Sequence, residues 1–155
     1  MGQVSMPVMT AIYHGSRLRQ GRFSEQGRVY HVTTVTKGRY PYFSDSHLAS
    51  LVCRTLLWSD LSGATTTLCY VLMPDHLHWL FQLGEGQALP GVMLRVKGRS
   101  GRLCGASLWQ RGYHDHAVRK EENIRDIARY IVANPLRAGL VRSLKDYPYW
   151  NAVWL

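Results

Sequence analysis

Cysteine and acidic residues are scarce in this 155-residue chain, and both shortages restrict the kind of protein it can be. The three cysteines, Cys53, Cys69 and Cys104, are scattered and form no CxxC pair, which argues against a disulfide framework and against a thiolate zinc site. No apolar run approaches the ~18 residues needed to cross a bilayer, and the first residues lack the pattern of a secretory signal. We therefore expect a cytoplasmic protein.

The shortage of acidic residues leaves a strong excess of positive charge. Lys and Arg total 19 against 10 Asp and Glu, which gives a formal net charge of +9 and a pI near 9.8. Such a balance favours polyanionic partners, of which nucleic acid is the commonest. A solvated basic surface without any ligand is the alternative.

The length and composition predict one folded domain with a basic extension before it. Hydrophobic residues make up 46% of the chain and charged residues 19%, as in compact globular proteins. We expect a basic N-terminal arm over residues 1–28, a folded domain over 29–142 and a C-terminal tail over 143–155. Arg17, Arg19 and Arg22 of the arm would be free to meet phosphate groups.

Hydrophobic periodicity predicts an α+β domain. Period-two, β-branched or aromatic stretches predict strands, and apolar residues spaced three and four apart predict helices. Strands are expected over 29–38, 65–73 and 76–83 and within 107–119, and helices over 46–59, 90–104 and 121–135. This order predicts a ferredoxin-like antiparallel sheet with helices packed on one face.

Two histidines alternate within the apolar stretch "MPDHLHWLF". Because successive side chains of a strand point to opposite faces, His76 and His78 should project from the same face. Two neutral imidazoles could then reach one divalent metal ion and leave open positions for a phosphate group. The alternative is that both are surface or core histidines held by hydrogen bonds.

A second pair of candidate residues lies on the last predicted helix. Tyr130 and Asn134 fall at the edge of its apolar stripe, four residues apart, so the phenol could reach toward the sheet and the amide oxygen could act as a third metal ligand. The alternative is a boundary core tyrosine followed by an asparagine that caps the helix ahead of Pro135.

Other basic and aromatic residues are candidates for contact with nucleic acid. Lys97, Arg99 and Arg102 give the helix over 90–104 a basic side that could neutralise phosphates. Tyr40, Tyr42 and Phe43 could stack on unpaired bases, although Phe43 suits the core equally well. His114 and His116 could act as a base or contact DNA, or have ordinary surface roles.

Four stretches together resemble a known family. They are "GRVYHVTTVTKGRYPYF", "YVLMPDHLHWLF", "LWQRGYHDHAVR" and "IARYIVANPLRAGLV". Their joint order is similar to the single-tyrosine HUH transposases of the IS200/IS605 type, and most similar to the branch called REP-associated tyrosine transposases. The similarity runs from about Ser16 to Val141. One departure is Asp75, where the family more often has Asn.

The resemblance implies a role for each site residue. His76, His78 and Asn134 would hold a divalent ion, Mg²⁺ or Mn²⁺, and Tyr130 would be the nucleophile of the catalytic domain over 29–142. The implied reaction cleaves single-stranded DNA, leaves a 5′-phosphotyrosine and a free 3′-OH, and rejoins strands by its reverse.

The resemblance also implies a partner and an assembly. The DNA would be a REP-type hairpin, which is an imperfect palindrome, and the DNA-bound protein would be associated with the nucleoid. The protein would act as a monomer, and a dimer is the other possibility. Two alternatives remain open. One is a non-catalytic DNA-binding protein of the same fold, and the other is a two-histidine hydrolase that uses bound water and does not need Tyr130.

Overall fold

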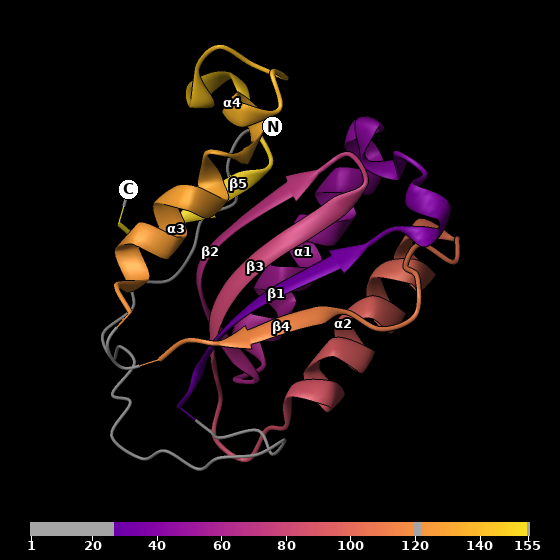
Figure 1. Cartoon of the computed structure of the whole chain (residues 1–155). Helices are drawn as coiled ribbons and strands as arrows, with labels where there is room; N and C mark the ends of the chain where they lie inside the picture. Colours follow the sequence, from indigo (N-terminus) through magenta and orange to yellow (C-terminus); the bar gives the residue numbers. More distant parts are fainter. Residues whose placement is uncertain (1–26, 120–121, 155) are drawn as a thin grey trace.

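The computed structural model describes residues 27–119 and 122–154 and contains one five-stranded sheet. The strands lie in the order β4, β1, β3, β2, β5, and every neighbouring pair is antiparallel. They are β1 Val29–Val35, β2 Thr65–Met73, β3 His76–Leu83, β4 His114–Ala117 and β5 Trp150–Ala152 (Figure 1). The helices are α1 Ser46–Leu61, α2 Leu89–Cys104, α3 Ile124–Val132 and the short α4 Asn134–Arg137. In the described part of the chain, no helix combines the length and apolar character that a bilayer crossing requires.

Local sequence signals account for most element ends. The Asp45 carboxylate accepts hydrogen bonds from the backbone of His47 and Leu48 and so caps the start of α1. Gly105 ends α2 in the left-handed conformation with φ 69°, which costs glycine little. A two-residue turn at Pro74 and Asp75 joins β2 to β3 as a hairpin. The predicted strand and helix positions are therefore confirmed to within a few residues, except in the last helix.

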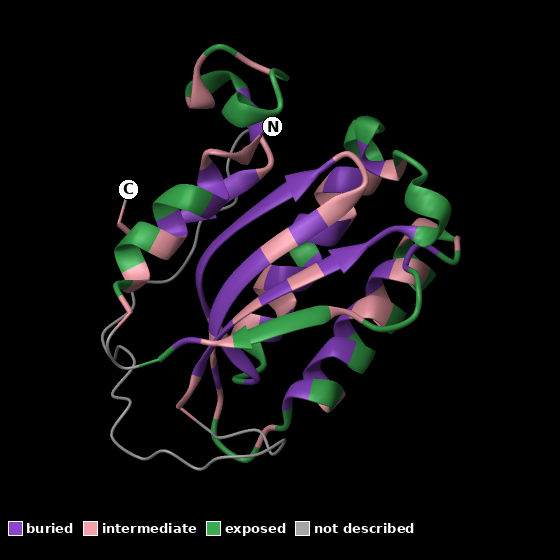
Figure 2. Ribbon diagram, in the orientation of Figure 1, coloured by how far each residue is buried: buried purple, intermediate pink, exposed green. Residues whose placement is uncertain are grey.

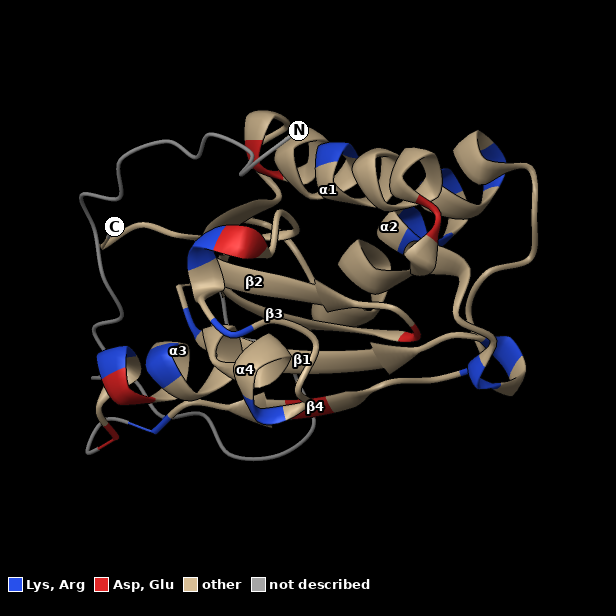
Figure 3. Ribbon diagram, turned by 90° about the horizontal axis from the view of Figure 1, so that it is seen from above, with Lys and Arg blue, Asp and Glu red and all other residues tan. Residues whose placement is uncertain are grey.

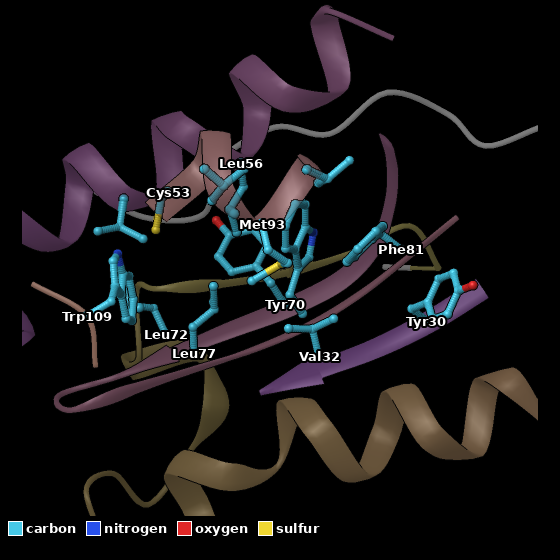
Figure 4. Close-up of a cluster of buried hydrophobic side chains, with 14 of the residues drawn as sticks. Tyr30, Val32, Cys53, Leu56, Tyr70, Leu72, Leu77, Phe81, Met93 and Trp109 are labelled. Atoms are coloured by element: carbon cyan, nitrogen blue, oxygen red, sulfur yellow. The ribbon is translucent and has the colours of Figure 1, made fainter. Parts of the chain in front are cut away.

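One face of the sheet is covered by α1 and α2. Every second residue of β3, starting at Leu77 and including Trp79 and Phe81, is fully buried between the sheet and these helices. Tyr70 and Met93 fill the same layer, so large aromatic and sulfur-containing side chains make up much of its volume (Figure 4). Apolar burial of this kind contributes about 25 cal/mol per Å² and is the main force holding the layers together.

The opposite face is only partly free. Helix α3 packs over β2 and β5 through Ala128, Ile131 and Val132, which contact a second buried cluster that includes Leu80 (Figure 1). The predicted ferredoxin-like α+β fold is confirmed, and the expected packing on one face holds for α1 and α2. Because the apolar stripe of α3 also needs burial, α3 covers the β2 side of the second face and leaves the β1 side open.

The last residues that the structure describes belong to this second layer. Strand β5 extends the sheet beside β2, Trp150 is buried, and the Tyr147 hydroxyl donates to the Leu72 carbonyl. The stretch expected as a C-terminal tail thus packs with the domain, because its aromatic residues find apolar partners there. Burial raises the pKa of the Tyr147 hydroxyl, so the group stays protonated as a donor.

A buried polar network ties the end of α1 to β2. The Asp60 carboxylate accepts hydrogen bonds from the Thr65 hydroxyl at 2.7 Å and from the Thr67 hydroxyl at 2.9 Å. The Thr67 hydroxyl in turn accepts the indole N–H of Trp79 at 2.9 Å. Burial raises the pKa of Asp60 and outweighs these hydrogen bonds, which lower it.

Replacing Asp60 with alanine should destabilise the protein. Thr65 and Thr67 would lose the acceptor of their hydroxyl groups inside the fold, and each unsatisfied buried group costs about 1 to 3 kcal/mol. We expect the free energy of unfolding, measured by urea denaturation, to fall by about 2 kcal/mol or more. The exposed Glu85→Ala variant is the matched control and should stay within about 0.5 kcal/mol of wild type. Equal stability of both variants would show that the network is unimportant.

Candidate active site

The predicted histidine pair lies on the face of β3 that looks away from α1 and α2. His76 and His78 alternate with the buried Leu77 and Trp79, so the burial of β3 changes from residue to residue (Figure 2). Both histidines are half-buried, and their ring centroids lie 5.0 Å apart in an edge-to-face arrangement. The structure thus brings the two imidazoles together as the sequence predicts.

Both rings are held through the same nitrogen. The Nδ1–H of His76 donates to the Asp75 carboxylate at 2.7 Å. The Nδ1 of His78 lies 3.1 Å from the Nε2 of His31 and 3.1 Å from the Thr33 hydroxyl. With Nδ1 engaged in each ring, Nε2 is the nitrogen left for a metal, and metal-binding histidines are commonly oriented in this way.

Asp75, the departure from the family pattern, is the partner that orients His76. Its second oxygen accepts a hydrogen bond from the Arg39 guanidinium at 2.9 Å. Partial burial raises the pKa of Asp75, but the hydrogen bonds and charges of His76 and Arg39 outweigh it and lower the pKa overall. The Asp75 side chain therefore carries a negative charge at neutral pH, whereas the amide of an asparagine at this position would be neutral.

His78 is kept neutral by its surroundings. Burial, followed by the nearby His76, His31 and Arg137, lowers the pKa of His78 to about 3. A neutral imidazole has a lone pair available for a metal, whereas a protonated one does not. The site therefore holds one ligand ready for a cation across the physiological pH range.

Tyr130 projects from α3 into solvent. Its side chain is 65% exposed, so the phenol is accessible to a macromolecular substrate. The guanidinium of Arg137, on α4, lies 3.8 Å from the centre of the Tyr130 ring. The positive charge of Arg137 also contributes to the lowered pKa of His78. Arg137 therefore interacts with one residue from each half of the predicted site.

Asn134 does not lie on the same helix as Tyr130, contrary to the prediction of one helix over 121–135. Helix α3 ends at Val132, and Asn134 begins α4. Pro135 has no N–H to donate to the carbonyl four residues earlier, and the Asn134 amide nitrogen donates to that Ile131 carbonyl at 2.8 Å instead. This bond fixes the amide so that its Oδ1 has no hydrogen-bond partner among the described residues.

The donor set suits a divalent cation with open coordination positions. Among the described residues, no three His, Cys, Asp or Glu side chains lie together as a metal site. In the predicted ligand set, the two imidazole Nε2 atoms and the Oδ1 of Asn134 would give a mixed nitrogen and oxygen coordination, which suits Mn²⁺ better than Mg²⁺. The oriented rings and the free amide oxygen are the observations that support this fit.

The basic residues predicted to bind DNA do not gather around this site. Arg17, Arg19 and Arg22 lie outside the described residues. Lys97, Arg99 and Arg102 lie on α2, which carries basic and no acidic residues and covers the other face of the sheet (Figure 3).

Two of these α2 cations also have contacts within the fold. The Lys97 ammonium donates to the carbonyls of Gln110 and Gly112, both at 2.8 Å. The Arg99 guanidinium lies 4.4 Å from the centre of the Trp58 ring. Arg102 is exposed and is the one of the three without such a contact among the described residues.

The aromatic candidates separate into surface and core. Tyr40 is 61% exposed and stacks against Tyr42 with ring centroids 4.7 Å apart, whereas Phe43 is buried against Trp109. The expectation that Phe43 suits the core is therefore confirmed.

His114 and His116 are both exposed, on the edge strand β4. The His116 Nε2 lies 3.0 Å from the Glu122 carboxylate. Strand β4 pairs with β1, so these two rings share the open face of the sheet with His31 and Thr33. They extend the polar surface beside the site and do not join it.

Sequence reasoning missed three neighbours of the site. His31 and Thr33 alternate on β1, but only the pairing of Thr33 with His78 across the sheet shows that they face the histidine pair. Arg137 stands seven residues after Tyr130, and it reaches the phenol only because the chain turns into α4. Their alternation and spacing were visible in the sequence, whereas the strand register and the turn were not.

An antiparallel ferredoxin-like sheet, a histidine pair on its central strand and an accessible tyrosine on a later helix match the single-tyrosine HUH class. Residues 25–134 match the model of the family described as transposase IS200 like. This match covers well over half of the chain, and the chain belongs to the IS200-like transposase family.

Individual relatives agree with the predicted branch. A REP-associated tyrosine transposase of Escherichia coli K12 is 29% identical over 82 residues, which are 52% of this chain and 50% of that protein. A Haemophilus influenzae sequence assigned to the same group is 26% identical over 54% of this chain and 56% of its own length. The chain thus spans about half the length of these relatives. The predicted resemblance to the REP-associated branch is confirmed.

A solved structure supports the fold. The structure of a REP-associated tyrosine transposase bound to a REP hairpin superposes with a TM-score of 0.73 at 20% identity. The superposition covers 86% of this chain and 82% of the other. At this level of identity the likeness establishes the shared fold.

The depressed pKa of His78 should make folding stability depend on pH. The unfolded chain takes up a proton at His78 near pH 6.5, whereas the folded protein resists it down to about pH 3, so this stability is present above pH 6.5 and is lost as the pH falls. From about pH 7 to about pH 5, metal-free wild type should lose about 1 to 2 kcal/mol more stability than His78→Gln. Denaturant unfolding in the presence of a chelator measures the stability of both proteins at each pH. Parallel losses in the two proteins would contradict the shift.

Proposed function

We propose that this protein is a strand transferase that cleaves and rejoins single-stranded DNA through a covalent bond to Tyr130. The observation that carries the proposal is Arg137, whose guanidinium lies 3.8 Å from the centre of the exposed Tyr130 ring and whose charge contributes to the lowered pKa of His78. In this proposal, one phosphate group would bind between the Tyr130 phenol, the Arg137 guanidinium and the two imidazoles. Membership in the IS200-like transposase family supports the same conclusion.

The residues of this chain divide the work of the reaction. The Tyr130 oxygen loses its proton to solvent, attacks the phosphorus and forms a phosphotyrosine, while the bond from phosphorus to the 3′ oxygen breaks and that oxygen takes up a proton as a free 3′-OH. The reverse step rejoins a strand without an external energy source, because the phosphodiester is exchanged and not hydrolysed. The Arg137 guanidinium, which lies over the Tyr130 ring, would attract the negatively charged phosphate toward the phenol.

His76, His78 and Asn134 would hold a divalent cation, Mn²⁺ or Mg²⁺, in this proposal. When bound, such an ion would polarise the phosphate and stabilise the charge that develops on it. Asp75, His31 and Thr33 orient the two rings by holding their Nδ1 atoms. The protein residues thus supply orientation before any ion binds.

The proposed substrate is a hairpin with single-stranded flanks of the REP type. The relative that shares this fold is bound to a REP hairpin, and the two partial sequence relatives are REP-associated transposases. The excess of 9 positive charges suits such a polyanion. Helix α3 packs over the sheet of its own chain, which supports the proposal that all site residues come from one protomer and that the protein acts as a monomer.

Tyr130→Phe should abolish covalent capture of DNA while leaving binding intact. The change removes the attacking oxygen from an exposed side chain, so neither the fold nor the phosphate contacts are altered. Wild type incubated with end-labelled single-stranded hairpin DNA and Mn²⁺ should give a denaturation-resistant adduct, and a chelator should prevent it. The variant should give none and bind the hairpin within about twofold of wild type.

The same experiment separates the alternatives. Binding without an adduct in wild type would identify a non-catalytic DNA-binding protein of this fold. Cleavage that survives in Tyr130→Phe would identify a hydrolase that uses water. Tyr149→Phe, a change on the half-buried C-terminal segment, is the matched control and should form the adduct as wild type does.

Arg137→Ala should slow adduct formation without weakening DNA binding to the same extent. A cation over an aromatic ring contributes about 0.5 to 2 kcal/mol, which corresponds to a rate loss of roughly 3- to 30-fold. Arg137→Lys should recover only part of the rate, because lysine lacks the planar group that stacks on the ring. Single-turnover rates at saturating DNA measure the effect, and the exposed Arg142→Ala is the control. Equal rates for the Arg137 and Arg142 variants would remove Arg137 from the site.

A further inference from the structure

A groove of about 810 Å³ lies between α2 and the segment 105–113, on the side of the sheet away from the histidine pair. Its apolar lining includes Met93 and Leu108, and at its edge Leu94 is 75% exposed. Pockets of this size and character usually hold a ligand of several rings or groups. Nothing in the proposed cleavage chemistry uses this groove.

Two glycines of α2 keep the groove open. Gly98 and Gly101 line it, although glycine inside a helix costs about 1 kcal/mol relative to alanine. A Cβ on Gly101 would lie 3.1 Å from the Ala106 carbonyl oxygen, so glycine is needed there for close packing. A Cβ on Gly98 would meet only the flexible end of Arg102 at 3.5 Å. Packing therefore does not require glycine at position 98, and a larger side chain there would project into the groove.

The rim of the groove is basic. Lys97, Arg102 and Arg111 line it, and no Asp or Glu is among its described lining residues. The two hydrogen bonds from Lys97 to the segment 105–113 fix the wall and bring the Lys97 ammonium 6.0 Å from the centre of the Tyr113 ring. An apolar floor inside a cationic rim suits a ligand that combines an anionic backbone with flat apolar groups.

Unpaired nucleotides have this combination, and paired ones do not. In a duplex the base faces are stacked inside and cannot reach an apolar floor, whereas unpaired bases can leave the stack and lie against side chains. Phosphates of the same segment would meet the basic rim. The charge and the apolar floor of the groove thus favour single-stranded DNA over the stem of a hairpin.

The position of the groove also fits a strand that continues to the cleavage site. The segment 105–113 leads directly into β4, which is the edge strand of the sheet. On the far side of that edge lie His116, His31 and then His78. We propose that the groove binds an unpaired segment of the DNA that flanks the cleaved phosphate, an inference that rests on the proposed function.

Gly98→Leu tests the groove. The leucine fills the space beside Met93 and Leu94, and it raises helix propensity, so thermal unfolding should show a melting temperature equal to or above that of wild type. Two labelled probes share one stem: a blunt hairpin and a hairpin with unpaired thymidine flanks. We expect affinity for the flanked probe, measured by fluorescence anisotropy, to fall roughly 5- to 100-fold, with the blunt probe bound within about twofold of wild type.

Two controls lie on the same helix. Gly91 is outside the groove, and a Cβ there would meet the flexible end of Arg95 at 3.3 Å, so Gly91→Leu should leave both affinities unchanged. Arg102→Glu should lower the affinity for the flanked probe more than Arg95→Glu does, because Arg95 does not line the groove.

The outcomes decide between occupants. Equal effects of Gly98→Leu on the two probes, or no effect on either, would overturn the groove inference. A wild-type dimer that Gly98→Leu converts to a monomer, seen by light scattering, would identify a second copy of the chain as the occupant and would also overturn it. Selective loss of the flanked probe in a protein that forms no Tyr130 adduct would uphold the groove and reject the cleavage. An adduct without selective loss would reject the groove alone.

Discussion

The alternation of side chains along β3 is the constraint on which the structure depends. This strand lies at the centre of the sheet, so one set of its residues must fill the core under α1 and α2 while the other set faces the second side. Leu77, Trp79 and Phe81 take the first role, and His76 and His78 take the second. A slip of one residue in register would bury the imidazoles and expose the aromatic core, so folding and the site depend on the same pairing.

Most of the contacts that orient the site residues would take no direct part in the proposed reaction. Asp75 and the pair His31 and Thr33 hold the two imidazoles through Nδ1, and the missing N–H of Pro135 is replaced by the Asn134 amide, which fixes the remaining oxygen donor. The guanidinium of Arg137 lies over the Tyr130 ring, and its charge also contributes to the lowered pKa of His78. Orientation of this kind lowers the entropy cost of assembling several groups around one phosphate.

The two faces of the sheet have different roles in the proposed activity. The second face, half covered by α3, carries the polar residues that would surround a phosphate in the proposed reaction, whereas α2 and the segment 105–113 on the first face form an apolar groove with a basic rim. The short edge strand β4 connects the two regions along the chain. A small domain can in this way hold a nucleic acid at one place and act on it at another.

The sequence by itself determined the order of the elements, the fold class, the common face of His76 and His78, and the buried stripe of α3, because these follow from periodicity over a few neighbouring residues. Only the tertiary structure decided that α3 covers the second face, that β5 joins the sheet, and that the break at Ala133 separates Asn134 from Tyr130. It also decided which residues surround the site, since His31, Thr33 and Arg137 reach it through strand register and a chain reversal. Register and packing depend on contacts between residues far apart in the chain, and no local pattern specifies them.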